Sequence, residues 1–211
     1  MSKIKIISFD LHETLSTPDF AVSVWDEGIP TVYAARCGIS LEKAKEEVKR
    51  EFAKVSDTEM EYYDLNYWSK LLNLGGYEKA IEHCKYRVAY YPETLPVLES
   101  LNKKYPLIIA TGMPREFIPT ILSRIEGYFT RVFSAYSDYN QFKTRSFYLT
   151  VCREMGIPPQ EVVHVGDNWQ KDVVIPKDIG IHAFHLDRKG NPDATTITSL
   201  EQLEEKIKSF S

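Results

Sequence analysis

The chain has 211 residues, of which 43% are hydrophobic and 27% are charged, a balance that is ordinary for a globular protein and excludes wholesale disorder. Lys and Arg number 26 against 30 Asp and Glu, a net charge of −4 that lacks the broad positive field of non-specific nucleic-acid binders. No apolar run approaches the roughly 18 residues of a membrane span, and the amino-terminal apolar run reaches Asp10 too soon for a secretory signal. At roughly 100–200 residues per domain, the length predicts one domain, or one domain with an inserted module, that acts on neither nucleic acid nor membrane.

Three cysteines, Cys37, Cys84 and Cys152, lie far apart in the chain and show no Cys-x-x-Cys spacing. Because an odd number cannot pair fully, they favour a reducing compartment, and we expect a cytoplasmic location. Each is interpreted as a small, buried hydrophobic residue.

The first predicted element is a short β-branched strand over residues 3–10, which ends in Asp10. The stretch 16–95 shows no confident strand and is rich in helix formers, so it is predicted to be helical. Its helices are expected at 41–54, with Ser40 as the N-cap, and at 62–74 and 77–90, separated by Gly75-Gly76.

From about residue 96, short strands alternate with helices, a pattern typical of right-handed βαβ units and a mostly parallel sheet. The predicted fold class is therefore α/β, with residues 1–15 and 96–211 as the core domain and residues 16–95 as a helical cap domain inserted after the first strand. His164, which alternates within its strand, is expected in the core. The strands are predicted at 106–110, 131–134, 161–165 and 181–186, and the helices at 97–104, 116–125, 147–155 and 200–210.

Polar residues follow four of the predicted strands, at the edge where open α/β sheets bind their ligands. Taken singly, each has a structural explanation: an Asp after a strand is usually a turn former or a helix cap, and a single Lys is usually a surface residue. Their joint location at one edge favours a functional site instead. The candidate residues are Asp10, His12, Thr111, Gly112, Lys143, Asp167 and Asp172.

The chemistry of these side chains points to phosphoryl transfer. Clustered carboxylates repel one another, and a hard divalent cation such as Mg²⁺, which favours oxygen ligands, relieves the repulsion. Asp10 can then serve both as a metal ligand and as a nucleophile. Thr111 and the Gly112 amide, at the start of a helix primed by Pro114, form a small cradle for an anion, and Lys143 supplies the positive charge that a phosphoryl group requires. The predicted reaction proceeds through an aspartyl intermediate.

Four segments resemble the motifs of the haloacid dehalogenase (HAD) superfamily. Residues 6–15, Ile-Ile-Ser-Phe-Asp-Leu-His-Glu-Thr-Leu, resemble the first motif, an apolar strand followed by Asp-x-Asp-x-Thr. Residues 107–112 resemble the second motif, and Lys143 lies where the third-motif lysine belongs. Residues 164–172, His-Val-Gly-Asp-Asn-Trp-Gln-Lys-Asp, are similar to the fourth motif, Gly-Asp-x-x-x-x-Asp. The first and fourth motifs are specific at this separation, and the resemblance covers residues 3–15 and 95–187.

This resemblance implies a Rossmann-like three-layer sandwich, in which the first strand lies between the strands that carry Thr111 and Asp167, and it implies that the helical insertion is the family's cap. The implied substrate is a small phosphorylated metabolite; its identity and the oligomeric state of the chain are open. The implied nucleophile is Asp10, and Thr111, Gly112 and Lys143 would hold the phosphate. The implied ligands of Mg²⁺ are Asp10, the backbone carbonyl of His12 and Asp167, with Asp172 supporting.

Two positions depart from the family pattern. The family's phosphatases carry a second Asp, as general acid and base, where this chain has His12. Because an imidazole can give and take a proton, His12 is either the acid–base group or a residue that serves the metal only through its carbonyl. The second departure is Ile175-Pro176 in place of Gly-Ala, where Pro176 is expected to shorten or kink the helix.

Three functions are compatible with these residues. The first is a Mg²⁺-dependent phosphatase of small phosphomonoesters. The alternative is a metal-independent 2-haloacid dehalogenase-type hydrolase, because the family's dehalogenases also lack the second Asp. Those enzymes, however, lose the acid of the Gly-Asp motif. The presence of Asp167 and Asp172 therefore favours a metal-dependent enzyme that acts on phosphate. A non-catalytic scaffold that binds phosphorylated ligands is the third, against which the retained Asp10, Lys143 and Asp167 speak.

Overall fold

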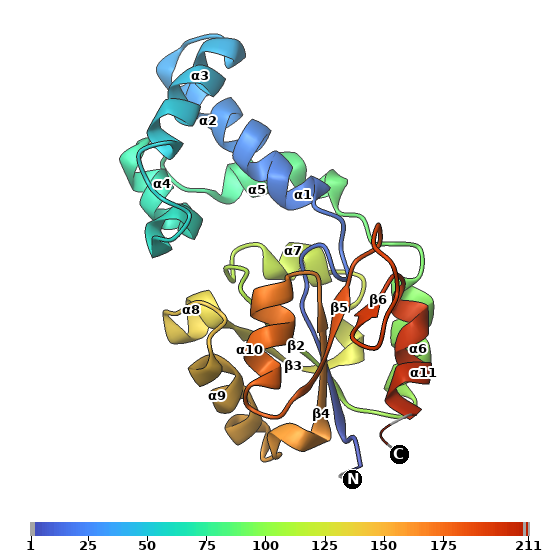
Figure 1. Cartoon of the computed structure of the whole chain (residues 1–211). Helices are drawn as coiled ribbons and strands as arrows, with labels where there is room; N and C mark the ends of the chain where they lie inside the picture. Colours follow the sequence, from blue (N-terminus) through green and yellow to red (C-terminus); the bar gives the residue numbers. More distant parts are fainter. Residues whose placement is uncertain (1–2, 209, 211) are drawn as a thin grey trace. The chain divides into compact units, whose positions relative to one another are not determined.

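The computed structural model describes residues 3–208 and 210, which divide into two compact units (Figure 1). The core unit contains the chain up to Thr17, Tyr90–Met113 and the chain from Leu122 onward, and the helical unit contains Pro18–Ala89 and Pro114–Ile121. The longer segment of the helical unit begins and ends close to the boundaries predicted for the cap. The shorter segment joins it from the part of the chain that the sequence pattern assigns to the core.

The core unit is built on a six-stranded sheet in the order β3-β2-β1-β4-β5-β6, in which all neighbouring strands pair in parallel. This arrangement confirms the predicted α/β fold and the place of the first strand between the strands that carry Thr111 and Asp167. The sequence pattern does not predict β6, because two residues are too few to show a period. The strands are β1 (Ile6–Phe9), β2 (Leu107–Thr111), β3 (Phe129–Ser134), β4 (Val162–Gly166), β5 (His182–Leu186) and β6 (Thr196–Ile197).

The three central strands, β1, β2 and β4, are buried at every residue. Parallel strands that are covered on both faces are continuous apolar runs rather than alternating ones, because neither face meets water. The middle of β1 pairs on both sides, since Ile7 lies opposite Leu107 of β2 and Val163 of β4. This double pairing aligns the carboxyl ends of the three strands at one edge of the sheet.

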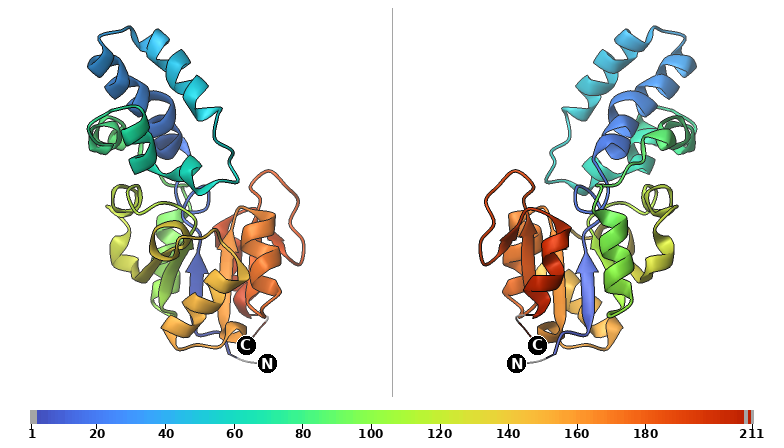
Figure 2. Two further views of the ribbon diagram at one scale, coloured as in Figure 1. Left: turned by 90° about the vertical axis from the view of Figure 1, so that its left-hand side faces the viewer. Right: turned by 90° about the vertical axis from the view of Figure 1, so that its right-hand side faces the viewer.

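Helices cover both faces of the sheet. α6 (Thr94–Asn102) and α11 (Leu203–Lys208) lie on one face, and α9 (Arg145–Met155) and α10 (Ile175–Lys177) lie on the other (Figure 2). This layering confirms the three-layer sandwich. The short α8 (Ala135–Tyr139) follows β3.

The helix that bears most on the site is α9, because it begins directly after Lys143 and Thr144. The Thr144 hydroxyl caps the helix by accepting a hydrogen bond from the Phe147 amide at 3.3 Å, and Gly156 ends it in the left-handed conformation. The helix therefore fixes the loop that carries Lys143. Its buried residues recur at helical spacing and join the core of the sheet; they are Phe147, Tyr148, Val151 and Cys152.

The helical unit is held together by aromatic rings. Phe52 contacts Trp25 and Trp68, at ring-centroid distances of 5.7 and 4.5 Å. Phe117, from the segment 114–121, contacts Phe20 at 6.1 Å and Trp25 at 5.9 Å, which ties that segment to this unit. The helices are α1 (Asp19–Ser23), α2 (Ile29–Cys37), α3 (Leu41–Phe52), α4 (Leu65–Leu71) and α5 (Glu78–Cys84), with a π-helical turn at Val24–Gly28.

Some predicted helix boundaries in the helical unit are wrong, because local turns replace helical ones. α3 begins as predicted, since the Ser40 hydroxyl accepts a hydrogen bond from the Lys43 amide. The helix predicted over 62–74 is instead α4, which begins only after Asp64 caps it through the Asn66 amide. The helix predicted over 77–90 ends at Cys84, where a 3-10 turn follows (Lys85–Arg87).

Boundaries also shift in the rest of the chain. The helix predicted over 116–125 is only the five-residue α7 (Ile118–Leu122), preceded by turns. The helix predicted over 200–210 begins with a 3-10 turn (Leu200–Gln202) before α11, and residue 209 of that prediction lies outside the described residues. α10 has three residues, with Pro176 in its first turn, and it directly continues a π-helical segment at Trp169–Val174, so the expectation that Pro176 shortens or kinks the helix stays a prediction. Among the described residues, no helix is long and apolar enough to cross a lipid bilayer.

All three cysteines are free. Cys84 and Cys152 are buried, as predicted, whereas the prediction for Cys37 is wrong, because it is exposed. Cys37 is the last residue of α2, directly before Gly38 ends that helix in the left-handed conformation.

Candidate active site

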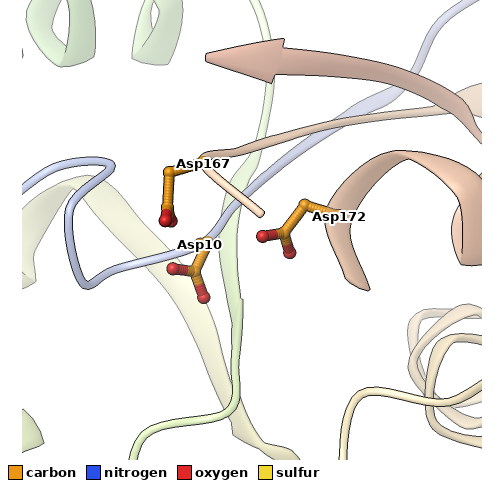
Figure 3. Close-up of side chains that lie close together, drawn as sticks. All are labelled: Asp10, Asp167 and Asp172. Carbon is orange, nitrogen blue, oxygen red and sulfur yellow. The ribbon is translucent and has the colours of Figure 1, made fainter. Parts of the chain in front are cut away.

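Three carboxylates converge at the carboxyl edge of the sheet (Figure 3). Asp10 follows β1 directly, and Asp167 and Asp172 follow β4. One oxygen atom of each lies within 4.8 Å of the others, and the three side chains point toward one another. Asp10 and Asp172 are buried, and Asp167 is half-buried. The cluster therefore concentrates negative charge where water is scarce.

Asp10 is fixed by the sheet that precedes it. Its amide donates a hydrogen bond to the carbonyl of Val165 at 2.9 Å, which extends the pairing of β1 with β4 by one residue. Its side chain accepts a hydrogen bond at Oδ1 from Lys143 Nζ at 2.8 Å. Oδ1 is thus neutralised by a cation, and the carboxylate is held in one orientation.

Lys143 is the cation of the site. Its ammonium group donates to Asp10 and to Asp172, and its side chain is 4% exposed. The aliphatic stem lies against Gly112, where an added Cβ would be 3.6 Å from Lys143 Cδ. Burial alone would lower the pKa of the ammonium, but the charges of Asp10 and Asp172 outweigh that effect and raise the pKa well above its usual value. Lys143 therefore carries its charge throughout the physiological range.

Asp172 is held from several sides. Its Oδ2 accepts a hydrogen bond from the Asn168 amide at 3.1 Å, and its carboxyl group lies so close to Gly166 that an added Cβ there would be 2.4 Å from Asp172 Cγ. Burial opposes ionisation, but the Lys143 charge and a hydrogen bond from His164 prevail and lower the pKa of Asp172 below its usual value. Asp172 is therefore an ionised partner of Lys143.

A buried hydrogen-bond network lies behind Asp172. His164 Nε2 is 3.1 Å from Asp172 Oδ1, and Nδ1 is 2.9 Å from the Ser8 hydroxyl. Burial lowers the pKa of His164, so the ring is neutral; because a carboxylate only accepts, Nε2 carries the proton and Nδ1 accepts from Ser8. The Tyr148 hydroxyl lies 3.1 Å from His164 Nε2 and donates to Asp172 Oδ1 or the Lys171 carbonyl, at 3.2 and 2.9 Å. The prediction that His164 lies in the core is confirmed.

Asp167 is the third carboxylate of the cluster. Burial, together with the charges of Asp10 and Asp172, raises the pKa of its carboxyl group to about 7. Its Oδ1 accepts a hydrogen bond from the Thr14 hydroxyl at 3.3 Å, and its backbone carbonyl accepts one from His185 Nε2 at 2.9 Å. Three carboxylates thus face a single ammonium, and this all-oxygen set fits the ligand preference of Mg²⁺.

Thr111 and Gly112 lie beside this cluster but not at the start of a helix. The Thr111 hydroxyl accepts a hydrogen bond from the Met113 amide at 3.2 Å, and the Met113 carbonyl accepts one from Ser134 at 2.7 Å. The expectation that Gly112 opens a helix is wrong, because turns follow it and α7 begins only at Ile118. Any anion cradle here is therefore a turn of the backbone rather than a helix terminus.

His12 lies in the loop that follows Asp10. Its side chain is 32% exposed, and its Nε2 is 3.9 Å from Glu13 Oε2. Nδ1 is enclosed, and no residue among 3–208 and 210 forms a hydrogen bond with it. The imidazole is therefore not committed to a structural hydrogen bond through Nδ1.

The structure thus joins Asp10, Lys143 and Asp172 in direct contact, adds Asp167 to the same cluster and places Gly112 against Lys143. The supporting network behind Asp172 is not predicted by the sequence pattern. One signal was available, since a polar His164 in an otherwise apolar strand requires a partner. The residues that were not predicted are Ser8, Tyr148 and Asn168.

A Rossmann-like sheet whose first strand delivers a buried Asp to a Lys and two further carboxylates defines a hydrolase of the HAD type. The family model of haloacid dehalogenase-like hydrolases matches residues 4–180, and the chain belongs to this family. No curated protein matches the chain.

Solved structures of similar fold include both phosphatases and dehalogenases. A HAD phosphatase from Thermococcus onnurineus is 26% identical, with a TM-score of 0.79 and coverage of 96% of this chain and 97% of that one. A 2-haloacid dehalogenase from Pseudomonas syringae pv. Tomato DC3000 is 21% identical, with a TM-score of 0.71 and coverage of 99% and 100%. A HAD-family protein from Bacillus subtilis, bound to magnesium, is 16% identical, with a TM-score of 0.66 and coverage of 98% and 99%.

Proposed function

We propose that this hydrolase is a Mg²⁺-dependent phosphatase of small phosphomonoesters that acts through an aspartyl-phosphate on Asp10. The observation that carries the proposal is the buried cluster in which Asp10 contacts Lys143 and shares a space with Asp167 and Asp172. Two acids after β4 suit a bound cation and a phosphoryl group. The similarity to a phosphatase at 26% identity supports the same activity.

The residues of the chain suit in-line displacement at phosphorus. A carboxylate oxygen of Asp10 forms a bond to phosphorus while the bond to the ester oxygen breaks, and the leaving oxygen takes up a proton. Lys143, charged and buried, offsets the negative charge that collects on the phosphoryl oxygens. Water then attacks the aspartyl-phosphate, which releases phosphate and restores Asp10. Thr111 and Gly112 are proposed to contact the phosphoryl group.

The metal of this proposal is Mg²⁺. Asp10, the backbone carbonyl of His12 and Asp167 would hold it, with Asp172 as the supporting residue. Bound there, it would supply positive charge to the transferring phosphoryl group.

His12 is proposed as the acid–base group. Its position two residues after the nucleophile is that of the second Asp in the family's phosphatases, and its side chain is 32% exposed, so part of the ring is accessible. As imidazolium it protonates the leaving oxygen, and as neutral imidazole it accepts a proton from the attacking water.

The second candidate function is a metal-independent 2-haloacid dehalogenase. His12 in place of the second Asp and the similarity in fold to a 2-haloacid dehalogenase favour it. The retained Asp167 and Asp172 favour the phosphatase. A scaffold that only binds phosphorylated ligands is the non-catalytic alternative.

One assay panel separates the three functions. Purified protein is incubated with phosphomonoesters and with 2-haloacids, each with Mg²⁺ or with EDTA, and phosphate and halide are measured. We expect phosphate release that requires Mg²⁺ and is abolished in Asp10→Asn, but is retained in Asp178→Asn, which alters a surface carboxylate paired with Arg145. Halide release that ignores EDTA would establish the dehalogenase, and tight ligand binding without either product would establish the scaffold.

We further propose a small phosphorylated metabolite as the substrate and a cytoplasmic location. The three free thiols support the location, because they suit a reducing compartment.

A further inference from the structure

Arg188, in the segment after β5, joins two parts of the core unit that are distant in sequence. Its Nη1 donates a hydrogen bond to the Glu13 carbonyl at 2.9 Å, and its Nη2 donates one to the Thr14 carbonyl at 3.0 Å. On the other side, Nη2 and Nε donate to Glu93 Oε1 at 2.7 and 3.1 Å. One guanidinium thus connects the loop after β1 with the segment that precedes α6.

The guanidinium is also stacked. Its central carbon lies 3.4 Å from the centroid of the Tyr91 ring, and the side chains of Arg188 and Glu93 are only 21% and 12% exposed. Stacking and partial burial reduce screening by water, so this ion pair is stronger than a surface pair. A Lys cannot reproduce the arrangement, because a single ammonium lacks the planar fork that reaches two carbonyls and a carboxylate together.

The loop held by Arg188 is the loop of the site. It begins after Asp10, contains His12, and includes Glu13, which has a φ of 56° in the left-handed region that residues other than glycine seldom adopt. The next residue, Thr14, donates its hydroxyl to Asp167. A backbone in this costly conformation persists only when its surroundings determine it, and Arg188 supplies two of the hydrogen bonds that do so.

The second segment held by Arg188 is the point where the chain returns to the core unit. The chain leaves this unit after Thr17 and re-enters it at Tyr90. The Thr94 hydroxyl also donates to the Leu15 carbonyl at 2.8 Å, so the two segments are joined within the core unit next to both connections.

We infer that Arg188 is a positioning residue that holds the loop 11–16 in the conformation that presents His12 and Thr14, and that joins this loop to the return segment 90–94. The structural part of this inference stands on the contacts of Arg188 alone. Its catalytic consequence rests on the proposed phosphatase function.

Hydrogen exchange of the metal-free protein tests the structural part. In Arg188→Ala, we expect the amides of residues 11–16 and 90–94 to exchange about tenfold faster, with no change in β2 or β4. Arg188→Lys keeps the charge and should show the same local increase. Arg131→Ala is the matched control: Arg131 also stacks on an aromatic ring, Phe133, at 4.5 Å and pairs with Glu154 at 2.7 Å, but it touches neither segment.

Three outcomes would overturn the inference: unchanged exchange in Arg188→Ala, an equal increase throughout the core unit, or full restoration in Arg188→Lys. Activity then tests the consequence. With p-nitrophenyl phosphate, we expect kcat of Arg188→Ala to fall about tenfold while KM changes less than about twofold, because the loop and not the binding surface is displaced. Unchanged kcat would refute the catalytic part. A wild-type protein without phosphatase activity would instead refute the proposed function, and the exchange data would still decide the role of Arg188.

Discussion

Replacement of Lys143 by Met tests whether the buried ammonium holds the carboxylate cluster together. Lys143 contacts Asp10 at 2.8 Å and also Asp172, and all three side chains are at most 8% exposed. Removal of one partner from a buried ion pair costs about 3–5 kcal/mol, because a charge is left without compensation. Here two carboxylates lose their cation, so we expect Lys143→Met to lower the free energy of unfolding by at least about 3 kcal/mol at pH 8.

The sign of the pH dependence follows from the same contacts. Without Lys143, burial outweighs the remaining favourable contacts of Asp172 and raises its folded-state pKa above the unfolded value, so this group protonates more readily in the folded protein. The loss of stability should therefore be full at pH 8 and shrink as the pH falls toward 5. Mg²⁺ added at pH 8 should restore part of it, since a bound cation compensates the same charges.

Urea unfolding of metal-free protein, followed by circular dichroism at pH 5 and pH 8, measures both effects. Lys103→Met is the matched control, because Lys103 forms an exposed pair with Glu99 on α6 and should cost less than about 1 kcal/mol. A loss below about 1 kcal/mol in Lys143→Met, or an equal loss at both pH values, would refute the electrostatic account of the cluster.

Three further predictions follow from the site. His12→Ala should lower phosphatase kcat by about 10²-fold or more, which is the usual contribution of general acid–base catalysis. His12→Asp should raise turnover above that of the wild type. Equal kcat values in His12→Ala and wild type would show that the ring takes no part in catalysis. Asp167→Asn should stabilise the metal-free protein by about 1–2 kcal/mol at pH 8 but not at pH 4. The reason is that the folded-state pKa of Asp167, about 7, lies above the unfolded value, so the stability from protonated Asp167 is lost as the pH rises through 7. An equal effect at both pH values would contradict this reasoning. With Mg²⁺ added, the wild type should become more stable to unfolding than Asp167→Asn. Gly166→Ala should lower the free energy of unfolding by about 1–3 kcal/mol, because its Cβ would lie 2.4 Å from Cγ of the tethered Asp172; Gly127→Ala, with no atom within 4 Å of the added Cβ, is the control and should be near neutral.

The convergence of Asp10, Asp167 and Asp172 could be predicted because it depends on a simple property of parallel sheets, whereas Lys143, which lies beyond α8 in the chain, was placed by its resemblance to the third motif. Each strand delivers whatever follows it to the same edge, so residues distant in sequence are adjacent when their strands are neighbours. Continuous apolar runs mark the buried strands, and the acidic residues that follow these runs can be identified from the sequence without knowledge of the tertiary structure.

The network behind Asp172 could not be predicted, because it depends on contacts across elements. His164 in an apolar strand indicates that a partner must exist, but not that Ser8 of β1 and Tyr148 of α9 supply it. Arg188 is a similar case. Its partners lie 95 and 175 positions away, and no local pattern connects them.

Helix ends were the least predictable feature of the fold. Residues 62–74 favour a helix throughout, yet Asp64 starts a new helix there by capping it, because its carboxylate offers the backbone a local hydrogen bond. α7 is short for a different reason: Phe117 packs among the rings of the helical unit, and the helix begins only after it.

The split course of the chain limits how the protein can be divided. A deletion that joins Thr17 directly to Tyr90 removes the long insertion but leaves residues 114–121 in place. Phe117 would then lose the rings of Phe20 and Trp25 and face solvent, together with its apolar neighbours. A core shortened in this way must therefore carry polar substitutions in residues 114–121. Without them, it will expose an apolar patch that promotes aggregation.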